Sequence, residues 1–170
     1  QFNGSIPAQI GNLSRLEWFA LKDNLITGTI PPELGKCQEL AQLELHNNSL
    51  SGVIPPEIAQ LRKLKLLSLF KNRLQGPVPA TLWRMGGLEE LHLYNNSLSG
   101  EVPAEITLMS SLRNLTLAYN NFSGELPQAL GFNTTPGLQS LDFTGNRFGG
   151  TIPPGLCTGG QLMILDLGHN

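Results

Sequence analysis

Two short sequence words recur along the whole chain with the same period, and this period constrains the fold more than any other feature. One word is Leu-x-x-Asn or Phe-x-x-Asn, with its asparagines at Asn24, Asn48, Asn72, Asn96, Asn120, Asn146 and Asn170. The other is Gly-x-(Ile/Val/Leu)-Pro, which begins at Gly4, Gly28, Gly52, Gly76, Gly100, Gly124 and Gly150. The asparagines are 24 residues apart except for one interval of 26, between Asn120 and Asn146. Such a period predicts a solenoid whose repeats bury their apolar side chains against one another.

Each repeat contains a short stretch of alternating apolar and polar residues, as in Leu91-His92-Leu93-Tyr94. This alternation predicts a strand with one buried face, and stacked repeats would place the strands in a parallel sheet. The asparagine that closes each strand is expected to bond backbone groups of its own and the next repeat. The glycine permits a tight turn, and the proline begins a short 3-10 or helical turn, such as 57–61. Because this side is bulkier, the strands should line the concave face of an arc.

The repeated unit resembles the plant-specific leucine-rich repeat over the entire chain, and residues 43–55 are its clearest copy. The resemblance is strongest to ectodomains of plant leucine-rich-repeat receptor-like kinases, including those that sense peptides. It implies an α/β solenoid on the extracellular side of the plasma membrane, with a membrane span and a Ser/Thr kinase elsewhere in the parent protein. Family members carry caps at both ends, so we predict that residues 1–170 form an internal segment of about seven 24-residue units without caps.

The composition argues against several other classes of protein. With 40% hydrophobic residues and a net charge of -2, the chain is too apolar for disorder and too nearly neutral for nucleic-acid binding. No apolar run is long enough to span a membrane, so any membrane attachment would come from a segment outside this sequence.

Nothing in the sequence indicates catalysis, a metal or a cofactor. The histidines His46, His92 and His169 lack the spacing of a metal site, and no nucleophile or phosphate loop accompanies the carboxylates Asp142 and Asp166. We therefore predict that the segment is not an enzyme and needs no cofactor.

The two cysteines, Cys37 and Cys157, lie five repeats apart. At about 4.8 Å per strand they are too distant for a disulfide. Each is predicted to be a small buried side chain.

The outward positions of the strands form columns, and the predicted ligand site lies where large apolar side chains occupy them. Phe70 and Tyr94 follow one another in one column, and Trp18 is a further candidate; the alternative is that the rings simply stack at tolerated exposed sites. Asp142 and Asp166 could hold a cationic group or be ordinary solvated carboxylates. The candidate ligand-binding residues are Leu66, Ser68, Phe70, Glu90, His92, Tyr94, Thr116 and Asp142.

Asn-x-Ser/Thr sequons predict N-glycosylation and a secretory route for the protein. They begin at Asn3, Asn12, Asn47, Asn95, Asn114, Asn121 and Asn133.

Our leading hypothesis is an extracellular segment that binds a secreted peptide or protein ligand and signals with a co-receptor kinase. One alternative is a secreted inhibitor that resembles polygalacturonase-inhibiting proteins, and another is a structural spacer within a longer ectodomain. Some peptide receptors of the resembled family bind a terminal carboxylate with paired arginines, but the columns here carry only the isolated Lys22 and Lys71. Either that site lies outside this segment or the ligand class differs.

Overall fold

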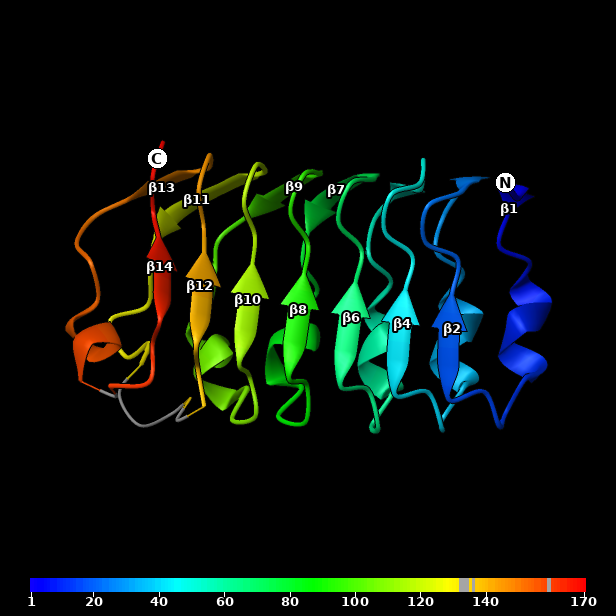
Figure 1. The fold of residues 1–170 in the computed structure, drawn as a ribbon, viewed down its shortest axis with the longest axis horizontal. Helices are drawn as coiled ribbons and strands as arrows, with labels where there is room; N and C mark the ends of the chain where they lie inside the picture. Colours follow the sequence, from blue (N-terminus) through cyan, green and yellow to red (C-terminus); the bar gives the residue numbers. More distant parts are fainter. Residues whose placement is uncertain (132–134, 136, 159) are drawn as a thin grey trace.

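Seven short strands, one from each repeat, form a parallel sheet that runs the length of the molecule. The computed structural model describes residues 1–131, 135, 137–158 and 160–170. In Figure 1 the strands of this main sheet lie side by side, with the short helices behind them. In chain order, the strands are β2 (Trp18–Ala20), β4 (Gln42–Glu44), β6 (Leu66–Ser68), β8 (Glu90–His92), β10 (Asn114–Thr116), β12 (Ser140–Asp142) and β14 (Ile164–Asp166).

Every strand of the main sheet pairs in the same register, so equivalent residues of successive repeats lie directly opposite one another. Leu67, for example, pairs with Leu43 on one side and Leu91 on the other. The longer interval does not disturb the pattern, because Leu115 still pairs with Leu141. The two extra residues of this interval are expected in the loop 131–136, most of which lies outside the described residues.

The return side of the repeats carries short helices, and all of those described are of the 3-10 type. The predicted turn at 57–61 is the helix η3 (Pro56–Gln60), which begins with a proline as expected. The others are η1 (Ala8–Asn12), η2 (Pro32–Lys36), η4 (Leu82–Arg84), η5 (Ala104–Leu108) and η6 (Pro154–Cys157). None of the described helices is long and apolar enough to cross a membrane. The predicted solenoid fold is confirmed.

A second sheet follows the asparagines and was not predicted. It contains β5 (Ser51–Gly52), β7 (Arg73–Pro77), β9 (Ser97–Gly100), β11 (Asn121–Glu125) and β13 (Arg147–Gly149), while β1 (Asn3–Ser5) and β3 (Leu25–Thr27) pair separately. The glycine of the second sequence word lies in most of these strands and directly follows β3 and β13. Figure 1 shows the strands along one border of the main sheet. The glycines have positive φ, such as 92° at Gly100, where a residue with Cβ would be strained.

The core lies between the main sheet and the helices. In the inner repeats the leucines on either side of an outward residue are fully buried, as at Leu91 and Leu93, whereas Leu165 in the last strand is 40% exposed. Cys37 is also buried, as predicted, but the prediction for Cys157 is wrong because its side chain is exposed. Cys157 follows the buried Leu156 in η6 and thus stands at the position of a surface residue, whereas Cys37 caps its helix from a core position.

A ladder of asparagines joins the repeats, but its direction differs from the prediction. Asn120 Nδ2 donates hydrogen bonds to the carbonyls of Leu117 and Ala118 in its own repeat and of Leu93 in the preceding one, at 2.9, 3.2 and 3.0 Å. Its Oδ1 accepts the N–H of Leu98, 2.9 Å away in the preceding repeat. Each such asparagine therefore bonds its own repeat, as predicted, but its other partners lie in the repeat before it and not in the repeat after it.

The 3-10 helices are not evenly packed against one another. A Cβ atom added to Gly35 would lie 2.5 Å from the carbonyl oxygen of Glu57, and Gly11 is equally close to Glu33, so glycine permits close packing of η1, η2 and η3. The equivalent residue in η3 is Ala59, and a hollow of about 650 Å³ lies between η3 and η4. It is on the return side of the repeats, away from the outward face of the main sheet.

Candidate functional site

The outward residues of the main sheet form the columns that the sequence predicts. In the first column Leu66 lies between Gln42 and Glu90, and in the second Ser68 lies between Glu44 and His92. Thr116 and Asp142 are the next members of the second column. The candidate residues therefore lie together on β6, β8, β10 and β12 and on the turns that follow β6 and β8.

Three rings from successive repeats are stacked at the centre of this face. The centroids of Phe70 and Tyr94 are 4.3 Å apart with ring planes 10° from parallel, and those of His46 and Phe70 are 4.1 Å apart at 16°. We call His46, Phe70 and Tyr94 the ring ladder. The sequence left open whether Phe70 and Tyr94 serve as binding anchors or simply stack, and the structure shows that they stack. The three stacked rings also form a half-buried apolar platform. Sequence reasoning left His46 out of the site, although it occupies the same column as the two aromatic residues.

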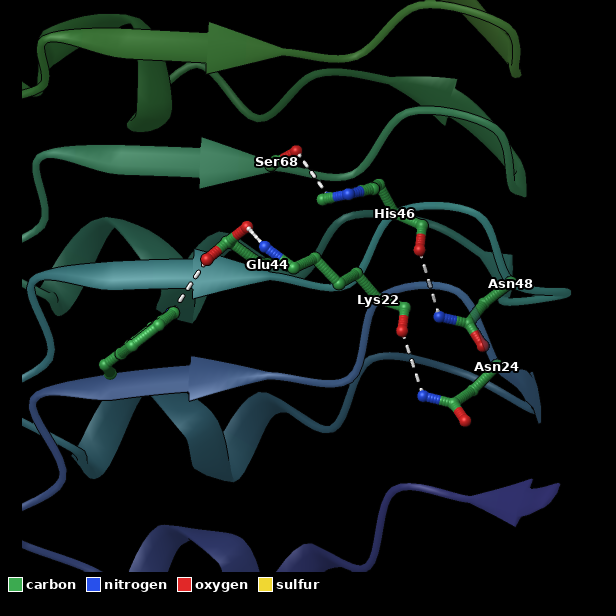
Figure 2. Close-up of polar contacts among 7 residues, drawn as sticks. Lys22, Asn24, Glu44, His46, Asn48 and Ser68 are labelled. Carbon is green, nitrogen blue, oxygen red and sulfur yellow. Dashed lines mark hydrogen bonds and ion pairs between the residues drawn. The ribbon is translucent and has the colours of Figure 1, made fainter. Parts of the chain in front are cut away.

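The histidine of the ring ladder is held in place by a neighbouring strand. Its Nδ1 lies 2.9 Å from Ser68 Oγ. Figure 2 marks this contact with a dashed line. Burial lowers the pKa of His46 below its usual range, because a charged imidazolium is less well solvated there. Ser68 itself is only 2% exposed, so its hydroxyl supports the ladder and is not open to a ligand.

The buried carboxylate of Glu44 links its repeat to the preceding one. Glu44 Oε2 accepts a hydrogen bond from Lys22 Nζ at 2.7 Å, and Oε1 accepts one from the indole N–H of Trp18 at 2.8 Å. Figure 2 shows Lys22 reaching across to Glu44. Trp18, a candidate anchor, has an exposed ring but its polar atom is already occupied.

This carboxylate makes stability depend on pH. Burial of Glu44 acts to raise its pKa, but the hydrogen bonds from Lys22 and Trp18 outweigh burial, so the pKa lies below its ordinary value of 4.5. A carboxyl group whose pKa is lowered by folding stabilises the protein above the unfolded pKa, and this contribution is lost as the pH falls through the folded pKa.

We therefore expect Glu44→Gln to lower the free energy of unfolding at pH 7 by about 1 kcal/mol. The difference from the wild type should shrink as the pH is lowered toward 3, because the Glu44 carboxyl takes up a proton as the pH falls through its pKa in the folded state. Urea unfolding at the two pH values measures the effect, with the exposed Glu17→Gln as the matched control. A penalty that is the same at both pH values would contradict the assignment of the effect to charge.

The remaining candidate residues pair within or next to their own strands. His92 Nε2 and Glu90 Oε2 are 3.0 Å apart on β8. Asp142 Oδ1 accepts the N–H of Thr144 at 3.1 Å, and its Oδ2 lies 3.5 Å from Thr116 Oγ1. These side chains are only partly buried and can still form further hydrogen bonds at the surface.

The neighbouring aspartate is held by its own backbone. Asp166 Oδ1 accepts the N–H of Gly168 at 2.9 Å, and this bond lowers the pKa of Asp166.

The sequon asparagines lie on different faces. Asn47 and Asn95 are exposed at turns beside the concave face, where their φ angles are 55° and 60°. Asn114 is half-buried on β10, and Asn121 accepts a hydrogen bond from Arg147 at 3.3 Å. Asn3 and Asn12 are exposed near the first repeat, and Asn133 lies outside the described residues. Glycan occupancy stays a prediction at all seven.

Among the residues that the structure describes, no three His, Cys, Asp or Glu side chains are arranged to hold a metal ion. What the concave face does offer is an apolar ring platform flanked by carboxylates, hydroxyls and an imidazole, which suits contact with an extended chain.

Comparison with known proteins identifies the family. Residues 3–131 match the family model described as a leucine-rich repeat region, and residues 137–158 match the leucine-rich repeat. A comparison with curated protein sequences gives no significant match. The chain belongs to the leucine-rich repeat family.

The most similar solved structures include ectodomains of plant receptors. The PEPR1–AtPEP1 structure is 44% identical with a TM-score of 0.96, over 99% of this chain and 23% of that one. The Arabidopsis receptor kinase HAESA ectodomain with an extended IDA peptide hormone is 37% identical with a TM-score of 0.92, over 98% and 28% of the chains. HAESA with IDA and the co-receptor SERK1 is 28% identical with a TM-score of 0.77, over 97% and 31%.

The chain thus spans less than a third of the length of these receptors. It has the fold and the repeat of a plant receptor kinase ectodomain, a ligand-binding and not a catalytic class of domain.

Proposed function

We propose that this segment binds a secreted peptide across its concave face, as part of a receptor on the extracellular side of the plasma membrane. The ring ladder is the observation that carries the proposal. Aromatic side chains are enriched among the residues that dominate binding energy, and here three of them are gathered at positions that the repeat leaves free. The parent protein would continue through a membrane span to a cytoplasmic Ser/Thr kinase.

The rest of the face suits an extended peptide. Glu90, His92, Thr116 and Asp142 lie on three adjacent strands beside the ladder and can bond backbone groups of a chain that crosses the strands. Leu66 adds apolar contact on β6. The similar HAESA ectodomain holds a peptide hormone, and another HAESA structure includes the co-receptor SERK1. By analogy, we propose a co-receptor kinase as the second partner.

The test is binding of a library of secreted plant peptides to the full glycosylated ectodomain, with Phe70→Ala/Tyr94→Ala beside the wild type. Removing two central aromatic anchors should weaken a specific hit by about 30-fold or more. The control is Leu108→Ala, which removes a large exposed side chain on η5, on the return side of the repeats.

Circular dichroism must first establish that all variants are folded. A peptide that binds the double variant as tightly as the wild type would make this segment a spacer and would place the ligand site in other repeats.

A further inference from the structure

Trp18 is a large apolar side chain on the outward face, and hydrogen bonding fixes its orientation. The residue is 59% exposed, yet its Nε1 donates a hydrogen bond of 2.8 Å to Glu44 Oε1. Glu44 is itself held, because it is only 7% exposed and its other oxygen accepts the Lys22 ammonium at 2.7 Å. An exposed ring that is already oriented loses little conformational freedom when a ligand packs on it.

Support of Glu44 alone does not account for an indole at this position. A serine, threonine or glutamine could donate to the carboxylate without exposing a large apolar surface. The next two strands carry Gln42 and Leu66 at the equivalent position, so the repeat does not require a tryptophan there. A large exposed apolar side chain at a position that the repeat leaves free is typical of a binding anchor.

The indole lies on a diagonal of the main sheet that leads to the ring ladder. Glu44 is one repeat and two residues beyond Trp18, and Phe70 is one repeat and two residues beyond Glu44. The hydrogen bond to Glu44 therefore turns the polar edge of the indole toward Phe70. In the repeat of Trp18, the column of the ladder holds Lys22, whose ammonium is bonded to Glu44. The ladder thus ends at His46, and the diagonal continues the apolar surface to Trp18.

We infer that Trp18 is a second anchor of the peptide site, and that the peptide carries two large apolar side chains four residues apart, one on Trp18 and the other on Phe70. The two anchors are separated by two strand spacings, about 10 Å, and by at most about 13 Å along the strands, so their Cα atoms lie about 16 Å apart. The indole extends into this gap, and four residues of an extended peptide, about 13 Å, bridge what remains. The inference rests on the proposed function, because it describes the peptide that the concave face binds.

The separation of four follows from the shape of an extended chain. Side chains three or five residues apart point to opposite faces of such a chain, so one of them would face away from the sheet. Two residues span about 7 Å and six about 20 Å, which is too short and too long for the two anchors. The surface between the anchors includes Glu44 and Ser68, which are buried and already hydrogen-bonded, so the intervening residues of the peptide need no particular side chains.

The experiment uses pools of random nonapeptides with phenylalanine fixed either at one position or at two positions that are two to six residues apart. Binding of each pool to the full glycosylated ectodomain is measured for the wild type, Trp18→Ala, Glu44→Leu and the double variant. The matched control is Leu25→Ala, which removes an apolar side chain of 53% exposure from β3, outside the main sheet. The pools test the separation on the wild type itself, without any substitution.

On the wild type, we expect the pool with a separation of four to bind about tenfold better than the pools with a single phenylalanine. Trp18→Ala should abolish this advantage while the single-phenylalanine pools still bind, and Leu25→Ala should retain it. The absence of an advantage at a separation of four, or an advantage that survives Trp18→Ala, would overturn the inference while leaving peptide binding intact. Binding of no pool at all would refute both this inference and the proposed function.

Glu44 acts through Trp18 as a positioning residue, and a double-mutant cycle tests this role. Glu44→Leu frees the indole and should reduce the advantage about threefold, but it should have no further effect when Trp18 is already alanine. An equal loss in both backgrounds would show that Glu44 acts on the fold alone and that the orientation of Trp18 contributes nothing to binding.

Discussion

Replacing Asn120 with alanine is expected to lower the free energy of unfolding by about 3–4 kcal/mol, the largest effect of any single change considered. The Asn120 amide makes four hydrogen bonds to backbone groups of two repeats, and its side chain is only 8% exposed. Alanine cannot replace any of them, and water has little access to the groups that remain. The N–H of Leu98 would be left buried without its acceptor, which is the most costly of the losses.

The matched control for this change is Asn114→Ala in the same repeat. Asn114 is half-buried on β10, and its side chain makes no hydrogen bond to another described residue, so its replacement should cost no more than about 0.5 kcal/mol. Urea unfolding of unglycosylated protein gives the two values. Amide exchange adds a local measurement, because the N–H of Leu98 should exchange faster only in Asn120→Ala. Equal destabilisation by both replacements would mean that the ladder asparagine acts merely as a side chain of suitable size.

The second large effect is expected for Gly35→Ala, at about 2–3 kcal/mol of destabilisation. The added methyl group would stand 2.5 Å from the Glu57 carbonyl oxygen and 2.9 Å from its Cβ, so η2 and η3 would have to move apart. Both nearby groups belong to rigid parts of η3 and cannot move aside as a flexible side chain would. The adjacent helix pair, where Ala59 already stands at this position, is the one with a hollow between its members.

Gly149→Ala is the control for this change, because a Cβ atom there would meet nothing within 4 Å and the residue has no positive φ. It should be neutral or slightly stabilising, since alanine restricts the unfolded chain. The comparison is made by urea or thermal unfolding of both variants. If Gly35→Ala is as stable as Gly149→Ala, the close helix packing contributes nothing.

Much of the architecture could be predicted because one residue pattern recurs in every repeat. The equal spacing of Leu43, Leu67 and Leu91 is enough to place them opposite one another, and the columns follow from that register. The second sheet was missed because its strands contain glycine, serine and proline, which a single repeat presents as turn residues. They pair only because the neighbouring repeat supplies the same backbone shape, as in the pairing of Ser123 with Arg147.

The site was harder to predict, because columns give the position of a Cα atom but not the direction of a side chain. The stacking of Phe70 on Tyr94 could be anticipated from their adjacent places. The capture of the Trp18 indole by Glu44 could not, since it depends on side-chain torsions that bring a carboxylate back across β2. For the same reason Ser68 was chosen as a ligand contact, although His46 covers it.

The direction of the asparagine ladder has a consequence for a chain that is synthesised from its N-terminus. The N–H of Leu98 finds its acceptor only when Asn120, 22 residues later, is in place. Each newly made repeat therefore completes its predecessor and leaves its own polar groups open until the next one emerges. The growing end always carries one unfinished unit, so a pause in translation would expose the same kind of incomplete edge wherever in the array it occurred.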